Sequence, residues 1–287
     1  MLWLPFSLLT AFFESAKDVF SKKSLQDLDA FTVAWALRFF ALPFLLPLLF
    51  FIDMPSPDGK FWMALLVNGS LNVATTVLYL EAIKQSDLSL SVPMVAFTPL
   101  FLLLTSPLIV GEFPNFLGLL GILLIVLGSY FLNIQERHKG YILPFKALIR
   151  ERGPRLMLLV ALIWSITSNF DKIGIGHSSP IFWAVTVNVF IALVLLSIML
   201  YRSGNNMRYI RTNFVALLPI GVCAAATSIF QMVAISLTLV VYVIAIKRTS
   251  AIMSVLFGHF VFKEKGVRER LTGAVTMLAG VLCIAFS

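Results

Sequence analysis

The chain alternates between long apolar runs and short polar segments. Charged residues, prolines or glycines bound the runs, which lie at about 2–20, 30–52, 61–83, 89–110, 116–134, 155–173, 180–201, 213–235, 238–262 and 270–286. A helix of about 20 apolar residues is long enough to cross a bilayer, and backbone groups in lipid must form hydrogen bonds within their own segment. The pattern therefore predicts an all-α polytopic membrane protein with ten transmembrane helices.

The two halves of the chain match when one is shifted against the other by 152 residues. The shift pairs residues of the same type, among them Gly69 with Gly221, Glu112 with Glu264, Gly121 with Gly273 and Gly128 with Gly280. Each half holds five runs, and an odd number of crossings places the two halves in opposite orientations. We expect a 5+5 inverted repeat, with its first repeat at 1–134, a basic connecting loop at 135–154 and a second repeat at 155–287.

Composition excludes a soluble globular domain, because 59% of the 287 residues are apolar and 13% are charged, against about 25% charged in soluble proteins. The net charge of +8 reflects the loops. Segments after odd-numbered runs carry 16 Lys and Arg residues, and segments after even-numbered runs carry 2. By the positive-inside rule, the odd segments are cytoplasmic and both termini are extracytoplasmic. The charge therefore indicates topology in a lipid bilayer, and we expect no nucleic-acid partner.

Two adjacent cations, Lys247 and Arg248, stand inside the ninth run. They lie about nine residues from its start, which places them roughly 13–15 Å into the membrane. Ser250 and Ser254 share the helix face of Lys247. Cations at that depth are costly to insert, and an anion between them would relieve their repulsion. The pair is the predicted binding site for an anionic or zwitterionic solute, and neutralisation by an acidic side chain is the structural alternative.

Polar side chains also follow helical spacing in both halves of the chain. The predicted substrate-binding residues of the third, sixth and eighth runs are Asn72, Thr75, Thr76, Tyr79, Asn169, Thr227, Ser228 and Gln231. Polar stripes of this kind either hold helices together or line an aqueous cavity. Because the stripes occur in both halves, we favour the cavity.

Acidic residues in the first run suggest two further roles. Glu14 is the candidate proton-coupling residue, with a permanent salt bridge to Lys247 or Lys17 as the alternative. Asp18 and Arg38 are charged, whereas their equivalents at a shift of 150 residues are both neutral. That pattern predicts a structural ion pair between the first and second runs.

Several of these motifs resemble the drug/metabolite transporter superfamily, of the type built from two EamA repeats. The resemblance rests on Pro93, Pro99, Gly111-Glu112, Gly118, Gly121 and Gly128, and on Lys263-Glu264, Gly273 and Gly280. It implies ten helices around a cavity lined mainly by the first, third, fourth, sixth, eighth and ninth. It also implies that both termini are cytoplasmic, which is the opposite of what the count of basic residues predicts. The ninth run is also similar to that of plastid sugar-phosphate/phosphate exchangers, where a Lys-Arg pair holds phosphate. Their sixth-helix lysine has only Lys172 as a near counterpart here.

The expected function is secondary-active transport of a small anionic or zwitterionic metabolite by alternating access in the plasma (inner) membrane. A proton-coupled exporter of amino acids or amphipathic solutes and a flippase for a lipid-linked anion are the alternatives, and an intramembrane enzyme is the rival class. No phosphate-binding loop, metal motif or nucleophile motif is present. We therefore expect no enzyme activity, no metal and no cofactor, and a homodimer stays open.

Overall fold

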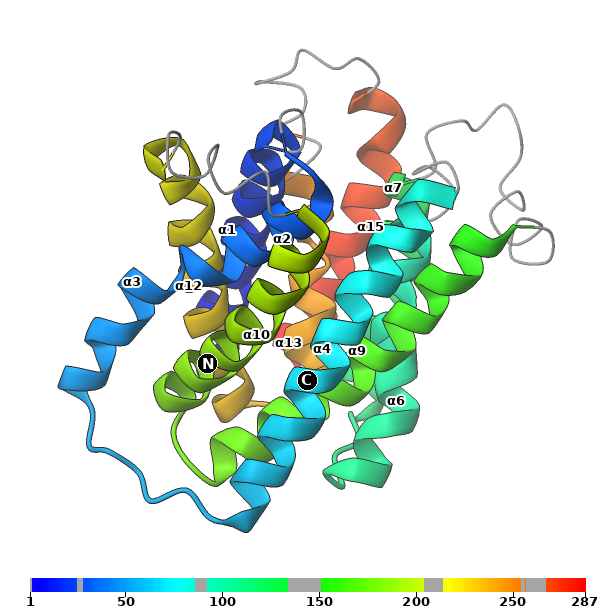
Figure 1. Cartoon of the computed structure of the whole chain (residues 1–287). Coiled ribbons are helices and arrows are strands. Elements are labelled where there is room, and N and C mark those ends of the chain that lie inside the picture. Colours follow the sequence, from blue (N-terminus) through cyan, green and yellow to red (C-terminus); the bar gives the residue numbers. More distant parts are fainter. Residues whose placement is uncertain are drawn as a thin grey trace.

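The computed structural model describes residues 2–24, 28–85, 92–133, 151–203, 214–253, 256 and 267–287, and these are almost entirely helical, with no strand among them. The first half contains α1 (Trp3–Ser24), α2 (Ala30–Phe39), α3 (Leu42–Leu45), η1 (Leu46–Phe51), α4 (Gly59–Gln85), η2 (Val92–Phe97), α6 (Thr98–Ile109) and α7 (Phe116–Asn133). The second half contains α9 (Arg152–Gly176), α10 (Pro180–Ser203), α12 (Phe214–Leu237), α13 (Val240–Lys247) and α15 (Val267–Ala285) (Figure 1).

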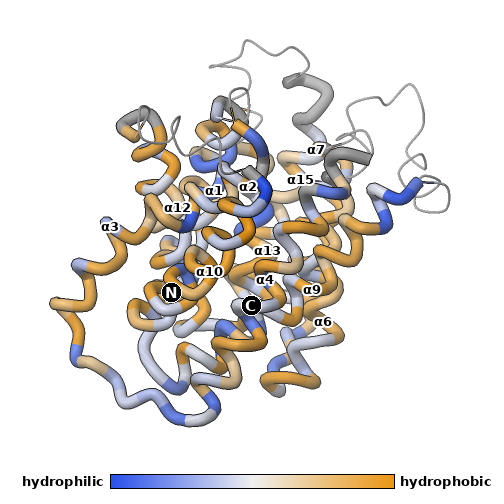
Figure 2. The backbone as a smooth tube through the Cα atoms, in the orientation of Figure 1, coloured by the Kyte–Doolittle hydropathy of each residue, from blue (hydrophilic) through white to orange (hydrophobic). Residues whose placement is uncertain are grey.

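Each of the ten predicted apolar runs contains helix, but not every helix has the length of a membrane span. Five segments are long and apolar enough to cross a bilayer: Phe31–Phe51, Gly59–Tyr79, Arg152–Gly176, Pro180–Arg202 and Leu217–Leu237. Shorter apolar helices cover Met94–Ile109, Phe116–Leu132 and Thr272–Ala285. Figure 2 shows apolar residues along most of the length of these helices, with polar residues gathered in the link that precedes α4.

Prolines interrupt two of the predicted runs. In the second run, α2 ends before Pro43 and is followed by the short helices α3 and η1, because proline lacks the N–H that continues a helix and clashes with the preceding turn. In the fourth run, the 3₁₀ helix η2 gives way to α6 at Thr98, with Pro99 in the first turn of α6. The fourth run is therefore interrupted by a change of helix type.

The equivalent helices α7 and α15 of the two halves approach each other closely at their glycines. A methyl group on Gly121 would lie 2.7 Å from the carbonyl oxygen of Gly280, and one on Gly128 would lie 2.6 Å from that of Gly273. Residue numbers rise along α7 while they fall along α15, so these two equivalent helices run antiparallel, as an inverted repeat requires. The glycine face of α7 is thus used inside the chain, where the sequence had left dimerisation open.

The remaining contacts between the halves follow the same exchange. α1 packs on α12 and α4 packs on α9, while α2 packs on α10 and α6 packs on α13. Exchanging the two repeats turns the α1–α12 contact into the α9–α4 contact. The α2–α10 and α6–α13 contacts each map onto themselves. The helices that carry the predicted site residues, α1, α4, α9, α12 and α13, therefore meet where the two halves join (Figure 1).

The links after the second, fourth, sixth and eighth runs meet at one end of the molecule. Asp58 Oδ2 lies 2.9 Å from His177 Nδ1, and Asn115 donates a hydrogen bond to the carbonyl oxygen of Ser287. The backbone N–H of Phe61, and after it His177, holds the pKa of Asp58 below its usual value. Even-numbered links and the C-terminal residue therefore share one face, as an alternating path of helices demands.

Candidate functional site

The two cations of the ninth run lie at a break in the helix. α13 ends at Lys247. In the next turn the hydrogen bonds reach back three residues instead of four, from Arg248 N–H to the Ala245 carbonyl and from Thr249 N–H to the Ile246 carbonyl. A cation at the end of a helix complements the negative pole of the helix dipole. The change from η2 to α6 at Thr98 is the equivalent position in the first half, because a shift of 152 residues takes it to Ser250. Both halves thus contribute a discontinuous helix.

Arg248 joins these two breaks. Its Nη2 donates a 2.9 Å hydrogen bond to Thr98 Oγ1, and its guanidinium lies 5.8 Å from the ring centre of Trp164. Its Nε atom is buried and has no hydrogen-bond partner. Across the part of the chain that the structure describes, no carboxylate lies within ion-pair distance of Arg248. The direct contacts of this guanidinium among those residues are therefore neutral groups.

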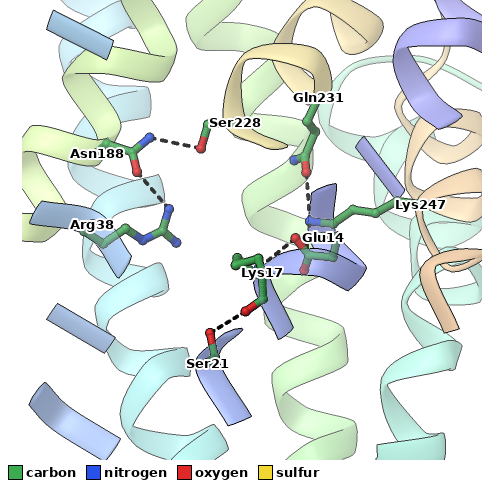
Figure 3. A network of polar contacts seen from close by, with 8 residues as sticks. All are labelled: Glu14, Lys17, Ser21, Arg38, Asn188, Ser228, Gln231 and Lys247. Carbon is green, nitrogen blue, oxygen red and sulfur yellow. Dashed lines mark hydrogen bonds and ion pairs between the residues drawn. The ribbon is translucent and has the colours of Figure 1, made fainter. Parts of the chain in front are cut away.

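Lys247 is held by the opposite set of helices. Its ammonium donates to Gln231 Oε1 at 2.9 Å and lies 3.6 Å from Glu14 Oε1. Glu14 also accepts from Lys17 at 2.7 Å, so one carboxylate lies between two ammonium groups (Figure 3). These contacts match the salt-bridge alternative for Glu14. A carboxylate held in this way has less freedom to exchange a proton than an unpaired one.

The predicted ion pair between Asp18 and Arg38 is wrong. Among the described residues the two form no ion pair, and Arg38 Nη1 instead donates to Asn188 Oδ1 at 3.1 Å. Asn188 in turn donates to Ser228 Oγ at 3.2 Å (Figure 3). The reason is the packing of the helices. α2 lies against α10 rather than against α1, so the nearest polar partner of Arg38 is its own repeat equivalent.

The polar stripe of α4 is mostly satisfied within that helix. Asn72 donates to the backbone oxygen and to the side-chain oxygen of Asn68, and both Thr75 and Thr76 donate to the Asn72 carbonyl. The Tyr79 ring lies 6.1 Å from the ring of Trp164, which is the ring that faces the guanidinium of Arg248. Of this group, Tyr79 is the residue that the structure brings nearest to the contacts of Arg248.

The other predicted binding residues divide into two groups. Asn169 is fully buried and binds Thr105 and Ser106 of α6, so it holds α9 and α6 together. In α12, Gln231 holds Lys247 and Ser228 binds Asn188, while the buried hydroxyl of Thr227 has no partner. Ser250 opens the turn that follows the break, and Ser254 lies outside the described residues.

The sequence analysis overlooked a buried acid, Asp171. Its carboxylate is 6% exposed and accepts hydrogen bonds from Asn68 of α4 and Trp183 of α10. Its neighbour Lys172 points elsewhere and lies 3.1 Å from Glu112. The available signal was a charged residue inside the sixth apolar run. It was missed because the adjacent Asp171-Lys172 resembles the polar boundary of a span.

Comparison with known proteins places the whole chain in context. The EamA-like transporter family matches residues 1–134 and again residues 152–286. No curated protein matches. A solved crystal structure aligns over 99% of this chain and 96% of its own, with a TM-score of 0.72 and 13% sequence identity. At that identity the alignment shows that the fold is shared. The resemblance inferred from the Gly-Glu and glycine motifs is confirmed by the family match.

Proposed function

This chain belongs to the EamA-like transporter family, and from that premise we propose that it is a secondary-active transporter of a small organic anion. As a member of a transporter family with long apolar helices, it is an integral multi-pass membrane protein. In our proposal ten helices cross the plasma membrane as two inverted repeats of five. The solute binds where the discontinuous helices of the two repeats meet, and the repeats rock about that point.

One observation carries the anionic character of the solute: Arg248 is a guanidinium at the helix breaks with no carboxylate partner among the described residues. A charged group inside the membrane region is expensive, and such groups mark solute pathways. A planar guanidinium suits a carboxylate or phosphate, which it binds through two parallel hydrogen bonds. The free Nε supplies one of the two donors that such a fork needs.

The structure also supports a division of labour between the two cations. Lys247 already has Glu14 and Gln231 as partners, whereas the partners of Arg248 among the described residues are Thr98 and the face of Trp164. An arriving anion would therefore bind Arg248 first. Lys247 then adds its charge as the solute competes with Glu14, whose 3.6 Å separation from Lys247 is longer than its 2.7 Å contact with Lys17.

Matched probes test the proposal. Purified protein in lipid nanodiscs is heated with glycerol 3-phosphate against glycerol, succinate against succinamide, and glutamate against glutamine. Bound ligand raises the unfolding temperature by mass action, so we expect a shift from an anionic member and none from its neutral partner. A solute that binds is then followed into proteoliposomes, where a transporter delivers it unchanged and an enzyme would alter it.

The variant Arg248→Ala then tests the proposed contact itself. Truncating one member of a buried charge contact costs about 2–5 kcal/mol of binding free energy, so we expect the affinity for the anion to fall at least about thirtyfold. Arg248→Lys keeps the charge but loses the fork, and we expect it to remain impaired. Arg155→Ala, which removes an exposed arginine outside the site, is the matched control. Parent-like affinity in Arg248→Ala would overturn the assignment.

A further inference from the structure

Asp171 is the buried acid that the proposed solute site leaves unexplained. Asn68 Nδ2 donates to Asp171 Oδ1 at 2.9 Å, and Trp183 Nε1 donates to the same oxygen at 2.8 Å. Asn68 is fixed in turn, because its amide also donates to the Thr167 carbonyl and accepts from Asn72. Within the described residues Oδ2 forms no hydrogen bond. One carboxylate oxygen is therefore held by donors from two helices, α4 and α10, while the other is left to gain a proton.

The surroundings of Asp171 contain little charge. Asn68 of α4 and Trp183 of α10 are neutral, and the segments of η2, α6 and α12 that pack on α9 contain no Asp, Glu, Lys or Arg. In the part of the chain that the structure describes, neither Lys247 of α13 nor Arg38 of α2 forms an ion pair with Asp171; Lys247 lies beside Glu14, and Arg38 binds Asn188. On its own helix, Lys172 is bound to Glu112. Burial disfavours a charged carboxyl group, and here no contacting cation offsets that penalty.

The position of Asp171 fits exchange with water on one side only. It lies five residues before the end of α9 at Gly176, which is roughly 8 Å along the helix axis. That end of α9 leads into the link at 177–179, on the face that holds Asp58 and His177. A proton therefore has a short path from this face and a long one from the other.

We propose that Asp171 binds a proton that is carried together with the anionic solute. The inference rests on the proposed function, because the coupling passes through the solute site. Lys247 lies on α13, which packs on the helix of Asp171, and a nearby cation favours the charged form of a carboxyl group. An anion bound beside Arg248 and Lys247 cancels that influence. A proton from water then forms an O–H bond on Oδ2 and neutralises the carboxylate. Because linkage is reciprocal, the proton strengthens anion binding by the factor with which the anion strengthens proton binding.

The indole N–H of Trp183 can report the protonation state of Asp171 in the absence of any solute. Its ring is fully buried, and its indole N–H donates to the titrating group, so its NMR resonance responds to the charge of Asp171. In protein with ¹⁵N-labelled indoles in nanodiscs, we expect that resonance, assigned with Trp183→Phe, to move in one titration step between pH 4 and 9. Asp171→Asn abolishes the step, and Asp53→Asn, an exposed link residue, leaves it unchanged. A resonance that stays constant with pH in the parent protein overturns the proposal.

Anion binding gives the second test, with whichever probe of the three pairs raises the unfolding temperature. One linked proton makes the affinity rise by up to about tenfold for each unit that the pH falls. We expect Asp171→Asn to lose this slope and to lose uphill uptake driven by a pH gradient, while exchange of labelled anion at equal pH persists. Unchanged pH-driven uptake in Asp171→Asn sinks the inference. If Trp183 titrates but Arg248→Ala binds the anion normally, the proposed solute site fails, and Asp171 remains a proton site without the proposed coupling.

Discussion

At the residue scale, amide side chains form hydrogen bonds with three of the buried charged groups. Arg38 binds Asn188 and Asp171 binds Asn68, while Lys247 binds Gln231 in addition to the carboxylate of Glu14. An amide satisfies the hydrogen bond of a buried charge but leaves its net charge in place. Charges held in this way stay available to a solute or a proton, whereas a complete ion pair is already neutral. Asp171, which we propose as a proton site, is held in this way.

Glu112 and Lys172 form the contrasting case, a complete ion pair with a structural role. Lys172 also donates to the carbonyl of Ile235, in the last turn of α12, and to that of Thr238, just past its end, and Glu112 accepts from the first N–H of α13, at Val240. One acidic and one basic side chain thus satisfy a helix end and a helix start together. The pair fixes the turn that positions α13 and therefore its terminal cations.

Removing either member should destabilise the protein. Glu112→Gln and Lys172→Met each leave the largely buried charge of the partner without its counter-charge, and we expect the free energy of unfolding to fall by about 1–3 kcal/mol. Chemical unfolding in detergent micelles measures this loss, and the double variant should lose less than the sum of the two. Lys60→Met, at an exposed lysine, is the control. Strictly additive losses would mean that the ion pair contributes no coupling.

At the element scale, two kinds of helix have different roles: continuous helices that pack closely, and helices that are broken partway along their length. α7 and α15 approach so closely at Gly128 and Gly273 that a side chain on either would meet the backbone of the other. In contrast, the helices of the fourth and ninth runs change type or end near Thr98 and Arg248. Irregular backbone at membrane depth persists only where protein or a cavity surrounds it. The first pair is suited to holding the two repeats together, and the second to forming a binding site.

The glycine contact predicts a sharp difference between two conservative changes. Gly128→Ala places a methyl group 2.6 Å from a backbone oxygen, and relief requires α7 and α15 to move apart. Overpacking of this kind costs typically about 1–3 kcal/mol. Gly59→Ala is the matched control, because a methyl group there meets nothing within 4 Å. Thermal unfolding of both variants is the measurement, and equal stability of the two would show that the α7–α15 interface yields without cost.

At the scale of the whole molecule, exchange of the two repeats organises the contacts. It relates the packing of α1 on α12 to that of α9 on α4, and the Gly121–Gly280 approach to the Gly273–Gly128 approach. Charge breaks this symmetry. Lys247 and Arg248 have Val95 and Ala96 as their equivalents, so the scaffold is shared by both repeats while the proposed anion site belongs to the second.

The side of the membrane on which the C-terminus lies can be tested directly. The even-numbered links share one face with Ser287, and the odd-numbered segments carry 16 of the basic residues. By the positive-inside rule, the C-terminus then lies outside the cytoplasm. A C-terminal reporter that works only outside the cytoplasm should be active, and one that works only in the cytoplasm should be silent. The reverse pattern would favour the cytoplasmic termini that the family resemblance implies.

Local pattern was enough to predict the helices and the matching halves. Hydropathy and helical period depend on residues within one segment, and repeat similarity is visible as spacing. The breaks at prolines were likewise predictable in the fourth run, because proline acts on its own turn. In the second run, Pro43 also indicated a break in the helix, but no break was predicted there.

Choice of partner was decided only by the tertiary structure. Asp18 and Arg38 looked like a pair by their charges, yet the packing of α2 on α10 gives Arg38 to Asn188. Glu14 could pair with Lys17 or Lys247, and the structure brings it to both. Asp171 gained significance only when Asn68 and Trp183 were seen to enclose it. Charge and spacing define what a side chain can bind, but the helix faces that meet determine which partner lies within reach.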